Sequence, residues 1–240
     1  MPFLETGGAR LYYEEVGSGP AVFLLAPGGM KSAIDFWRRA DWNPITELAD
    51  SHRVIAMDQR NAGKSSAPVT AHDSWQTYAD DQLALLDHLG VDQFHVMGMC
   101  IGGPYAMGLI KAVPQRVRSA VLFQSIGLMA DDKNRNAFYA MFDGWAEELQ
   151  EGSTADANDW QSFRSNMYDG DNFLFNVGDE FVAQLKTPLC VLEGNDLYHP
   201  KETSLRIREL AADVLYIDSW KEEAVRPDAM RQVREFLAQH

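Results

Sequence analysis

The order of apolar runs predicts an α/β fold with a mostly parallel sheet and helices on both faces. Three observations lead to this prediction. A hairpin pattern opens the chain, short continuous apolar runs then alternate with amphipathic stretches, and one long insertion interrupts the alternation. Continuous apolar runs of strand length are typical of parallel strands that helices cover on both sides.

The first two strands are expected to form a hairpin, because Gly7-Gly8 separates residues 3–6 from residues 11–16. This hairpin is predicted to be the antiparallel edge of the sheet. The remaining strands are expected at residues 21–26, 53–58, 94–98, 119–125, 188–193 and 213–219.

Helices are expected between these strands. Asn43-Pro44 suits the cap and first position of a short helix. The stretch 75–89 has apolar residues on one stripe, and Gly90 supplies its end. Further helices are expected at residues 102–112, 201–211 and 227–238.

Residues 128–187 break the alternation of strands and helices. This stretch is rich in aromatic residues, namely Phe138, Phe142, Trp145, Trp160, Phe163 and Tyr168. A structureless loop of such length is uncommon in a compact domain. We therefore predict a helical cap at 128–187, inserted into a core made of residues 1–127 and 188–240, with the aromatic side chains lining a pocket.

Composition narrows the function classes. The chain has 240 residues and a formal net charge of −14, which disfavours nucleic-acid binding. It has no apolar run of the ~18 residues that a membrane helix needs, and its first residues lack a secretory signal pattern. Two cysteines form no disulfide framework. We expect a cytoplasmic protein with a small-molecule substrate or ligand and no membrane partner; its oligomeric state is open.

The turn Gly98-Met99-Cys100-Ile101-Gly102 lies between a predicted strand and a predicted helix. A sharp strand-to-helix turn leaves no room for side chains at its glycines. It exposes the central residue at the carboxyl edge of the sheet, beside a helix N-terminus. The partial positive charge there favours a thiolate and a developing oxyanion.

This turn resembles the nucleophile elbow of the α/β-hydrolase family. Two further stretches resemble that family: Pro27-Gly28-Gly29 after a strand, and residues 58–65 (DQRNAGKS), where Asn61 replaces a commoner glycine. The resemblance implies that Cys100 is a nucleophile. Most of the family carries serine there, whereas the dienelactone hydrolases carry cysteine. The expected substrate is a small acyl compound, such as an ester, lactone, thioester or activated C–C bond.

The resemblance also implies an oxyanion hole. One donor is expected from the backbone N–H of Ile101. The second is expected from the loop after the first long strand, where Gly28, Gly29 and Met30 are all candidates.

The acid and base are expected after the elbow. Asp196 follows a strand, where the family carries its acid, although an aspartate there also suits a helix cap. The family's base is a histidine after the last strand, but residues 216–223 contain none. Only His199 and His240 lie downstream of the elbow, and His240 is the final residue. His199 is therefore the candidate base, although its closeness to Asp196 makes it hard to aim both groups at Cys100.

A second interpretation stays open. A hydrolase-like chain that has lost its base could serve as a small-ligand binder or a partner-interaction module. The sequence has no metal-ligand spacing, no dinucleotide fingerprint and no phosphate loop, so neither a metal nor an organic cofactor is expected.

Overall fold

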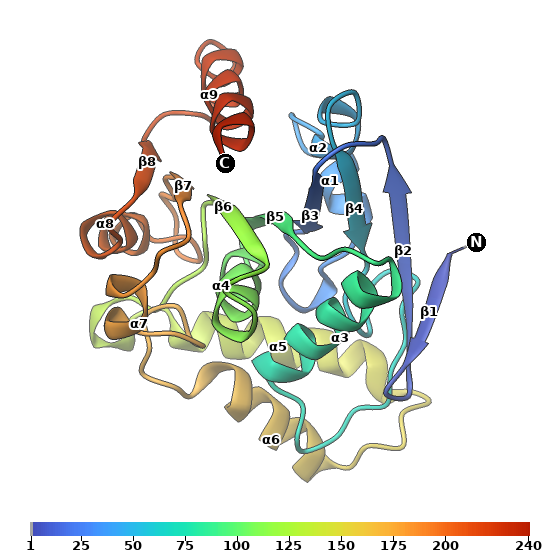
Figure 1. Ribbon diagram of the computed structural model, residues 1–240. Helices are drawn as coiled ribbons and strands as arrows, with labels where there is room; N and C mark the ends of the chain where they lie inside the picture. The colour runs from blue at the N-terminus through green and yellow to red at the C-terminus, as the bar shows by residue number, and fades with distance from the viewer. Residues whose placement is uncertain (1) are drawn as a thin grey trace.

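The computed structural model describes residues 2–240 and contains an eight-stranded sheet (Figure 1). Its strands are β1 (Phe3–Thr6), β2 (Ala9–Val16), β3 (Ala21–Leu25), β4 (Arg53–Met57), β5 (Phe94–Met99), β6 (Val117–Phe123), β7 (Leu189–Leu192) and β8 (Val214–Ile217). They lie in the order β1-β2-β4-β3-β5-β6-β7-β8. The pairs β1–β2 and β2–β4 are antiparallel and the other pairs are parallel. The predicted fold class is confirmed, with the hairpin at one edge.

Both faces of the sheet are buried, as the continuous apolar runs predict. In β3, Phe23 and Leu25 join one apolar cluster, while Val22 and Leu24 join the other, because successive strand residues point to opposite faces. Helices α3 (Trp75–His88), α4 (Gly102–Ala112) and α8 (Lys201–Leu210) contribute to the first cluster. Helices α1 (Ile34–Arg38), α2 (Pro44–Glu47) and α9 (Arg226–Gln239) contribute to the second.

The largest error in the predicted strand boundaries is at β6, which begins at Val117 and ends at Phe123 rather than spanning 119–125. Val117 pairs with Phe94, so the sheet begins earlier than the apolar pattern indicated. Gln124 has a φ of 36°, which lies in the left-handed region. That backbone conformation is incompatible with a strand and ends β6 two residues early.

The stretch between β6 and β7 contains η2 (Ala130–Asp132), α5 (Arg135–Gln150), α6 (Ala157–Tyr168) and α7 (Asp179–Ala183). We call residues 128–187 the β6–β7 segment. Helices α5 and α6 lie across the end of the sheet toward which the arrow of β4 points, which is the carboxyl end of the parallel strands (Figure 1). The segment is therefore close to the turns where the candidate site residues lie.

Aromatic side chains of the β6–β7 segment pack against one another. The rings of Phe138 and Tyr168 stack with centroids 5.6 Å apart, and those of Trp145 and Trp160 meet edge to face at 5.9 Å. All six aromatic residues named from the sequence are buried. They form a core between the segment and the sheet.

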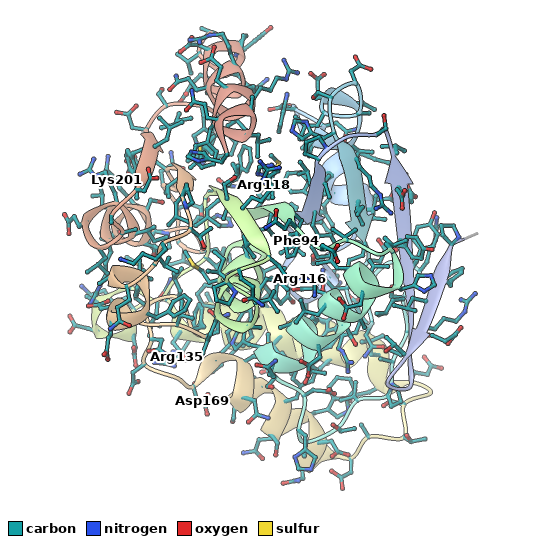
Figure 2. The ribbon with its side chains drawn as sticks, in the orientation of Figure 1. Phe94, Arg116, Arg118, Arg135, Asp169 and Lys201 are labelled. Atoms are coloured by element: carbon teal, nitrogen blue, oxygen red, sulfur yellow. The ribbon has the colours of Figure 1, made fainter. Side chains whose placement is uncertain are left out.

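Polar contacts join α5 to the end of α6. Arg135, at the start of α5, donates hydrogen bonds to the backbone oxygens of Tyr168 and Gly170. The Tyr139 hydroxyl, one turn further along α5, donates to the carboxylate of Asp169 at 2.6 Å. Arg135 and Asp169 both lie at this junction (Figure 2). Within residues 2–240, no helix combines the length and apolar character needed to cross a membrane.

Candidate active site

Cys100 lies at the turn between β5 and α4, with a φ of 60°. A non-glycine residue in this region of backbone space is strained, as expected for a nucleophile elbow. The flanking glycines make the turn possible. A Cβ at Gly98 would lie 2.1 Å from the backbone oxygen of Gly102, and one at Gly102 would lie 2.3 Å from that of Leu25. Only glycine fits at either position.

Cys100 is half-buried, and its thiol has polar neighbours. Burial raises its pKa, but the His199 side chain and the backbone amides of Gly28 and Ile101 outweigh burial, so the pKa lies below its ordinary value. Cys190 differs, because it lies in β7 without such neighbours and burial raises its pKa to about 12. Cys100 is therefore the more reactive of the two thiols at neutral pH.

The loop after β3 contributes the second amide near the thiol. Of the three candidates from the sequence, Gly28 is the one whose amide lowers the pKa of Cys100. Gly28 has a φ of 118° and Gly29 a φ of 58°, so glycine is favoured at both. A Cβ on Gly29 would lie 2.4 Å from the sulfur of Met141, which shows that α5 packs directly on this loop.

Asp196 and His199 form a hydrogen-bonded pair after β7. His199 Nδ1 donates to the carboxylate, lying 2.8 Å from each of its oxygens. Asp196 Oδ1 also accepts from the backbone amides of Tyr198 and His199, each at 3.0 Å. The carboxylate thus closes a tight turn that brings the imidazole back over it. The short spacing therefore allows the acid and the imidazole to pair within one turn.

The other imidazole nitrogen, His199 Nε2, is buried and has no hydrogen-bond partner among residues 2–240. Burial lowers the pKa of His199, but the Cys100 thiol and the Asp196 carboxylate outweigh it and raise the pKa. Burial likewise raises the pKa of Asp196, and the hydrogen bonds from His199 outweigh it and lower the pKa. The two groups that raise the pKa of the imidazole are thus the Cys100 thiol and the Asp196 carboxylate. No hydrogen bond between His199 and Cys100 is formed in this geometry.

The loop after β8 serves a structural role. Trp220 Nε1 donates to the backbone oxygen of Glu193 at 2.9 Å, and its ring meets Phe123 edge to face at 5.4 Å.

The ring of His240 packs against Phe236 at the end of α9. Arg118, at the start of β6, donates to the backbone oxygen of His240 (Figure 2). His240 is thus held at the amino end of β6, whereas Cys100 lies at the carboxyl edge.

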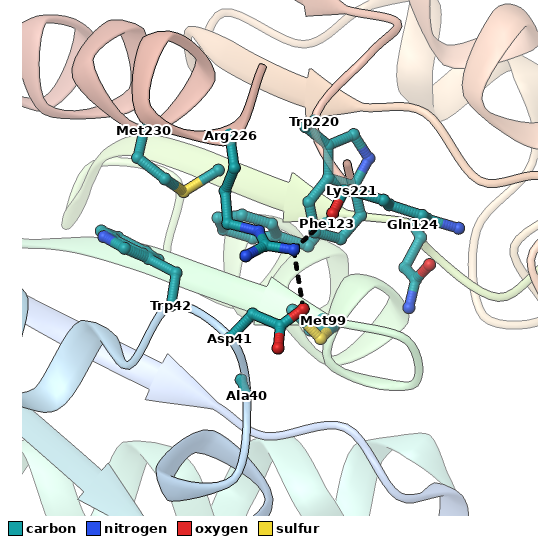
Figure 3. A pocket seen from close by; sticks show the side chains of 10 residues that line it. All are labelled: Ala40, Asp41, Trp42, Met99, Phe123, Gln124, Trp220, Lys221, Arg226 and Met230. Carbon is teal, nitrogen blue, oxygen red and sulfur yellow. Dashed lines mark hydrogen bonds and ion pairs between the residues drawn. The ribbon is translucent and has the colours of Figure 1, made fainter. Parts of the chain in front are cut away.

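A cavity of about 280 Å³ lies beside the elbow on the α1 and α9 side of the sheet (Figure 3). Trp42, Phe123 and Trp220 form its aromatic walls, and Arg226 pairs with Asp41 at 2.8 Å across it. Met99 reaches this cavity, but Cys100 and His199 do not line it. The cavity is therefore separate from the thiol and the imidazole.

The loop at residues 58–65 supports the loop after β3 and the start of α1. Asp58 accepts hydrogen bonds from the backbone amides of Ile34 and Lys64, both at 2.8 Å. The backbone amide of Gln59 donates to the oxygen of Ser32, two residues beyond Met30. Asn61 has a φ of 57°, which explains why glycine is common at this position in the family. The resemblance at this loop therefore has a structural cause.

Arg60, in the same loop, is buried between two carboxylates. It pairs with Asp73 at 2.9 Å and with Asp81 at 2.8 Å. Both partners are buried, so the guanidinium offsets one of the two carboxylate charges and the three side chains fix the connection between β4 and α3.

Asn134 is a polar residue near the site that sequence reasoning missed. It is 1% exposed and its side chain donates to the backbone oxygens of Gly127 and Leu197. Leu197 lies between Asp196 and His199. No local pattern marks Asn134, because its partners are distant in the sequence. Among residues 2–240, no group of three histidine, cysteine or carboxylate side chains is placed to hold a metal ion.

Comparison with known proteins gives curated relatives over about half of the chain. A putative carbamate hydrolase RutD from Azorhizobium caulinodans is 38% identical over 122 residues, which cover 51% of this chain and 43% of that protein. A 2-hydroxymuconate semialdehyde hydrolase from a Pseudomonas species is 32% identical over 122 residues, covering 50% of this chain and 42% of that protein. The matched part is thus less than half the length of these relatives.

Solved structures resemble the whole chain. A meta-cleavage product hydrolase from Pseudomonas fluorescens superposes with a TM-score of 0.72 at 20% identity, covering 100% of this chain and 96% of that one. An enol-lactonase from Burkholderia xenovorans gives a TM-score of 0.71 at 17% identity, covering 100% of both chains. At these identities the likeness concerns the fold.

The family model described as "alpha/beta hydrolase fold" matches residues 21–234, which include the elbow, the loop after β3 and the Asp196–His199 turn. This match agrees with the sheet order, with the strained residue between β5 and α4, and with the solved structures. The chain therefore belongs to the alpha/beta hydrolase fold family.

Proposed function

We propose that the protein is a hydrolase of small acyl compounds, such as esters, lactones, thioesters or activated C–C bonds, with Cys100 as its nucleophile. One observation carries this proposal: His199 donates a hydrogen bond to Asp196 through Nδ1, while its Nε2 is buried and has no partner. The Cys100 thiol is also one of the groups that raise the pKa of this imidazole. A base that a carboxylate orients toward a nucleophile is a recurring arrangement in covalent catalysis.

The first half of the reaction forms an acyl-enzyme. The Cys100 thiolate attacks the carbonyl carbon, and the carbonyl oxygen becomes an oxyanion. The backbone amides of Gly28 and Ile101 donate hydrogen bonds to it. The His199 imidazolium donates its Nε2 proton to the leaving group. The carbon–leaving-group bond then breaks, which leaves a thioester on Cys100 and a neutral imidazole.

The second half hydrolyses the thioester. Neutral His199 takes a proton from a water molecule, and the resulting hydroxide attacks the thioester carbonyl. The carbon–sulfur bond breaks, the Cys100 thiolate leaves, and the acid product is released. Asp196 stays ionised throughout and stabilises the imidazolium.

We infer that the β6–β7 segment is a helical cap over this site. Its helix α5 packs on the loop after β3, where Met141 lies against Gly29. Lys31 of the short 3-10 helix η1 (Gly29–Lys31) also pairs with Glu148 of α5. A cap in this position limits substrate size and excludes water from the reacting centre. A reactive free thiol also requires a reducing compartment, so we propose that the protein works in the cytoplasm.

The names of the relatives support a hydrolase of small substrates, since they include a putative carbamate hydrolase, a semialdehyde hydrolase and an enol-lactonase. The alternative, a ligand binder that has lost its base, relied on the missing histidine after β8. The position of His199 beside Asp196 favours the hydrolase, because a pure binder has no need of such a pair.

A panel of nitrophenyl esters, lactones and thioesters tests the proposal with the wild type, Cys100→Ala and the control Cys190→Ala. We expect Cys100→Ala to lose activity by at least about 100-fold, while Cys190→Ala keeps its rate per folded molecule. Trapping an acyl group on Cys100 by intact-mass analysis gives independent support. Wild-type rates equal to those of Cys100→Ala on every substrate, together with tight binding of a small ligand, would favour the binder.

A further inference from the structure

The Asn134 side chain joins two loops that are far apart in the sequence. Its amide nitrogen donates to the backbone oxygen of Gly127 at 2.8 Å and to that of Leu197 at 2.9 Å. Its amide oxygen accepts from the backbone N–H of Met129 at 2.9 Å. The residue is 1% exposed. Both amide protons are therefore used inside the protein, away from water.

The position of Asn134 makes these contacts unusual. It is the residue immediately before α5, where asparagine ordinarily caps the helix with its side chain. Its side chain makes no such cap here. The hydrogen bonds go instead to the loop after β6 and to the Asp196–His199 turn. Asn134 thus lacks the usual capping bond and connects these loops instead.

The Asp196–His199 turn depends on such outside contacts. Asn195, Leu197 and Tyr198 are exposed, so little apolar burial holds the turn in place. Besides the Asn134 hydrogen bond, the turn has a contact with Phe138, which lies in α5 one helical turn after Asn134. The ring of Phe138 meets that of Tyr198 edge to face at 5.5 Å. Asn134 supplies the directional contact of the two, because its hydrogen bond fixes the backbone between the acid and the base.

We propose that Asn134 is a positioning residue that holds His199 over Cys100 by fixing the backbone oxygen of Leu197. This inference deepens the proposed function and rests on it. Without the amide donor, the exposed turn has no directional bond to α5, and the imidazole withdraws from the thiol. Because His199 lowers the pKa of Cys100, its withdrawal raises that pKa toward the ordinary value.

The sign of the pH effect follows from this shift. A thiol with a lowered pKa stays ionised, and so reactive, at pH values where an ordinary thiol is protonated. Loss of the His199 contact therefore slows thiol modification at mildly acidic pH. At pH values well above both pKa values the thiol is ionised in every variant, and the variants lose their disadvantage, because a thiolate of higher pKa is the stronger nucleophile.

The experiment measures the rate of Cys100 alkylation by iodoacetamide between about pH 5 and pH 10, with intact-mass analysis. The variants are Asn134→Ala, the similarly sized Asn134→Leu, and His199→Ala as the reference for a lost base. The matched control is Asn166→Ala. Asn166 also donates to two backbone oxygens, those of Ala71 and Asp73 at 2.9 and 3.0 Å, but it lies on α6.

We expect Asn134→Ala and Asn134→Leu to react about 5- to 10-fold more slowly than the wild type near pH 6 and at least as fast near pH 10, approaching the profile of His199→Ala. We expect Asn166→Ala to keep the wild-type pH profile of alkylation, even if it lowers the melting temperature as much as the Asn134 variants do. If the Asn134 variants slowed alkylation only through a general loss of stability, Asn166→Ala would slow alkylation equally.

Two results would overturn the inference, and they differ. If the wild type reacts faster than His199→Ala near pH 6 but both Asn134 variants follow the wild type, His199 acts on the thiol and Asn134 does not position it. If wild type and His199→Ala have the same profile, the Cys100–His199 pair itself is absent. The proposed function then loses its base and the role of Asn134 falls with it.

Discussion

Cys100 and His199 divide the chemistry unequally between the two halves of the proposed reaction. A cysteine has a pKa of about 8.5, so a small fraction is ionised at neutral pH even without a base, and helix-end amides increase that fraction. Acylation can therefore proceed slowly without His199. Hydrolysis of the thioester cannot, because water needs a general base to become a nucleophile.

For this reason His199→Ala is expected to slow turnover more than acylation. With nitrophenyl acetate, stopped-flow measurement should show a burst of one nitrophenolate per folded molecule, followed by a steady state about 100-fold or more below the wild type. His72→Ala, which changes an exposed histidine, is the control. Unchanged burst and turnover in His199→Ala would mean that another group is the base.

At the scale of the element, the elbow is fixed by backbone contact rather than by side chains. The carboxyl end of β5, the start of α4 and the end of β3 meet so closely that a Cβ at Gly98 or Gly102 would collide with a backbone oxygen. Such an oxygen cannot move without displacing a strand or a helix. The strained backbone at Cys100 is held by this close packing.

Gly98→Ala and Gly102→Ala are therefore each expected to lower the free energy of unfolding by about 2–4 kcal/mol. Gly144→Ala is the matched control, because Gly144 lies within α5 and a Cβ there meets nothing within 4 Å. That substitution should stabilise the protein by about 0.5–1 kcal/mol, since alanine favours a helix over glycine. Urea unfolding measures all three, and equal effects at the three positions would contradict this account.

At the scale of the whole molecule, the β6–β7 segment shares its core with the sheet. Phe138 and Phe163 of the segment belong to the same apolar cluster as Phe23 and Val96 of the central strands. Polar contacts add to this. Trp75 of α3 donates to the backbone oxygen of Met167 at 2.7 Å. The segment therefore has no separate core of its own.

Because the core is shared, the β6–β7 segment and the sheet are expected to unfold together. Tryptophan fluorescence, which reports on Trp145 and Trp160 among others, should show the same urea midpoint as far-UV circular dichroism. Calorimetric and van't Hoff enthalpies should also agree. A fluorescence transition at clearly lower urea than the loss of secondary structure would show that the segment unfolds on its own.

The sequence by itself determined the features that depend on neighbouring residues. Continuous apolar runs identified the strands, because burial on both faces leaves no polar positions in β3 or β7 and only His95 in β5. The glycine spacing around Cys100 identified the strand-to-helix turn because the steric restriction there is also local. A Cβ at Gly98 would clash with Gly102, only four residues away. The end of β6 was misplaced because the left-handed backbone at Gln124 leaves no mark in an apolar run.

Only the tertiary structure decided how the candidate site is assembled. The spacing of Asp196 and His199 argued against a working pair, and the hydrogen bonds of Asp196 to its own turn reversed that argument. The choice of Gly28 among three possible donors needed the position of the loop relative to the thiol. Asn134 meets Leu197 across 63 residues of sequence, so no local pattern could reveal it. The Gly28 and Asn134 contacts arise from the packing of distant segments, which periodicity and local spacing do not encode.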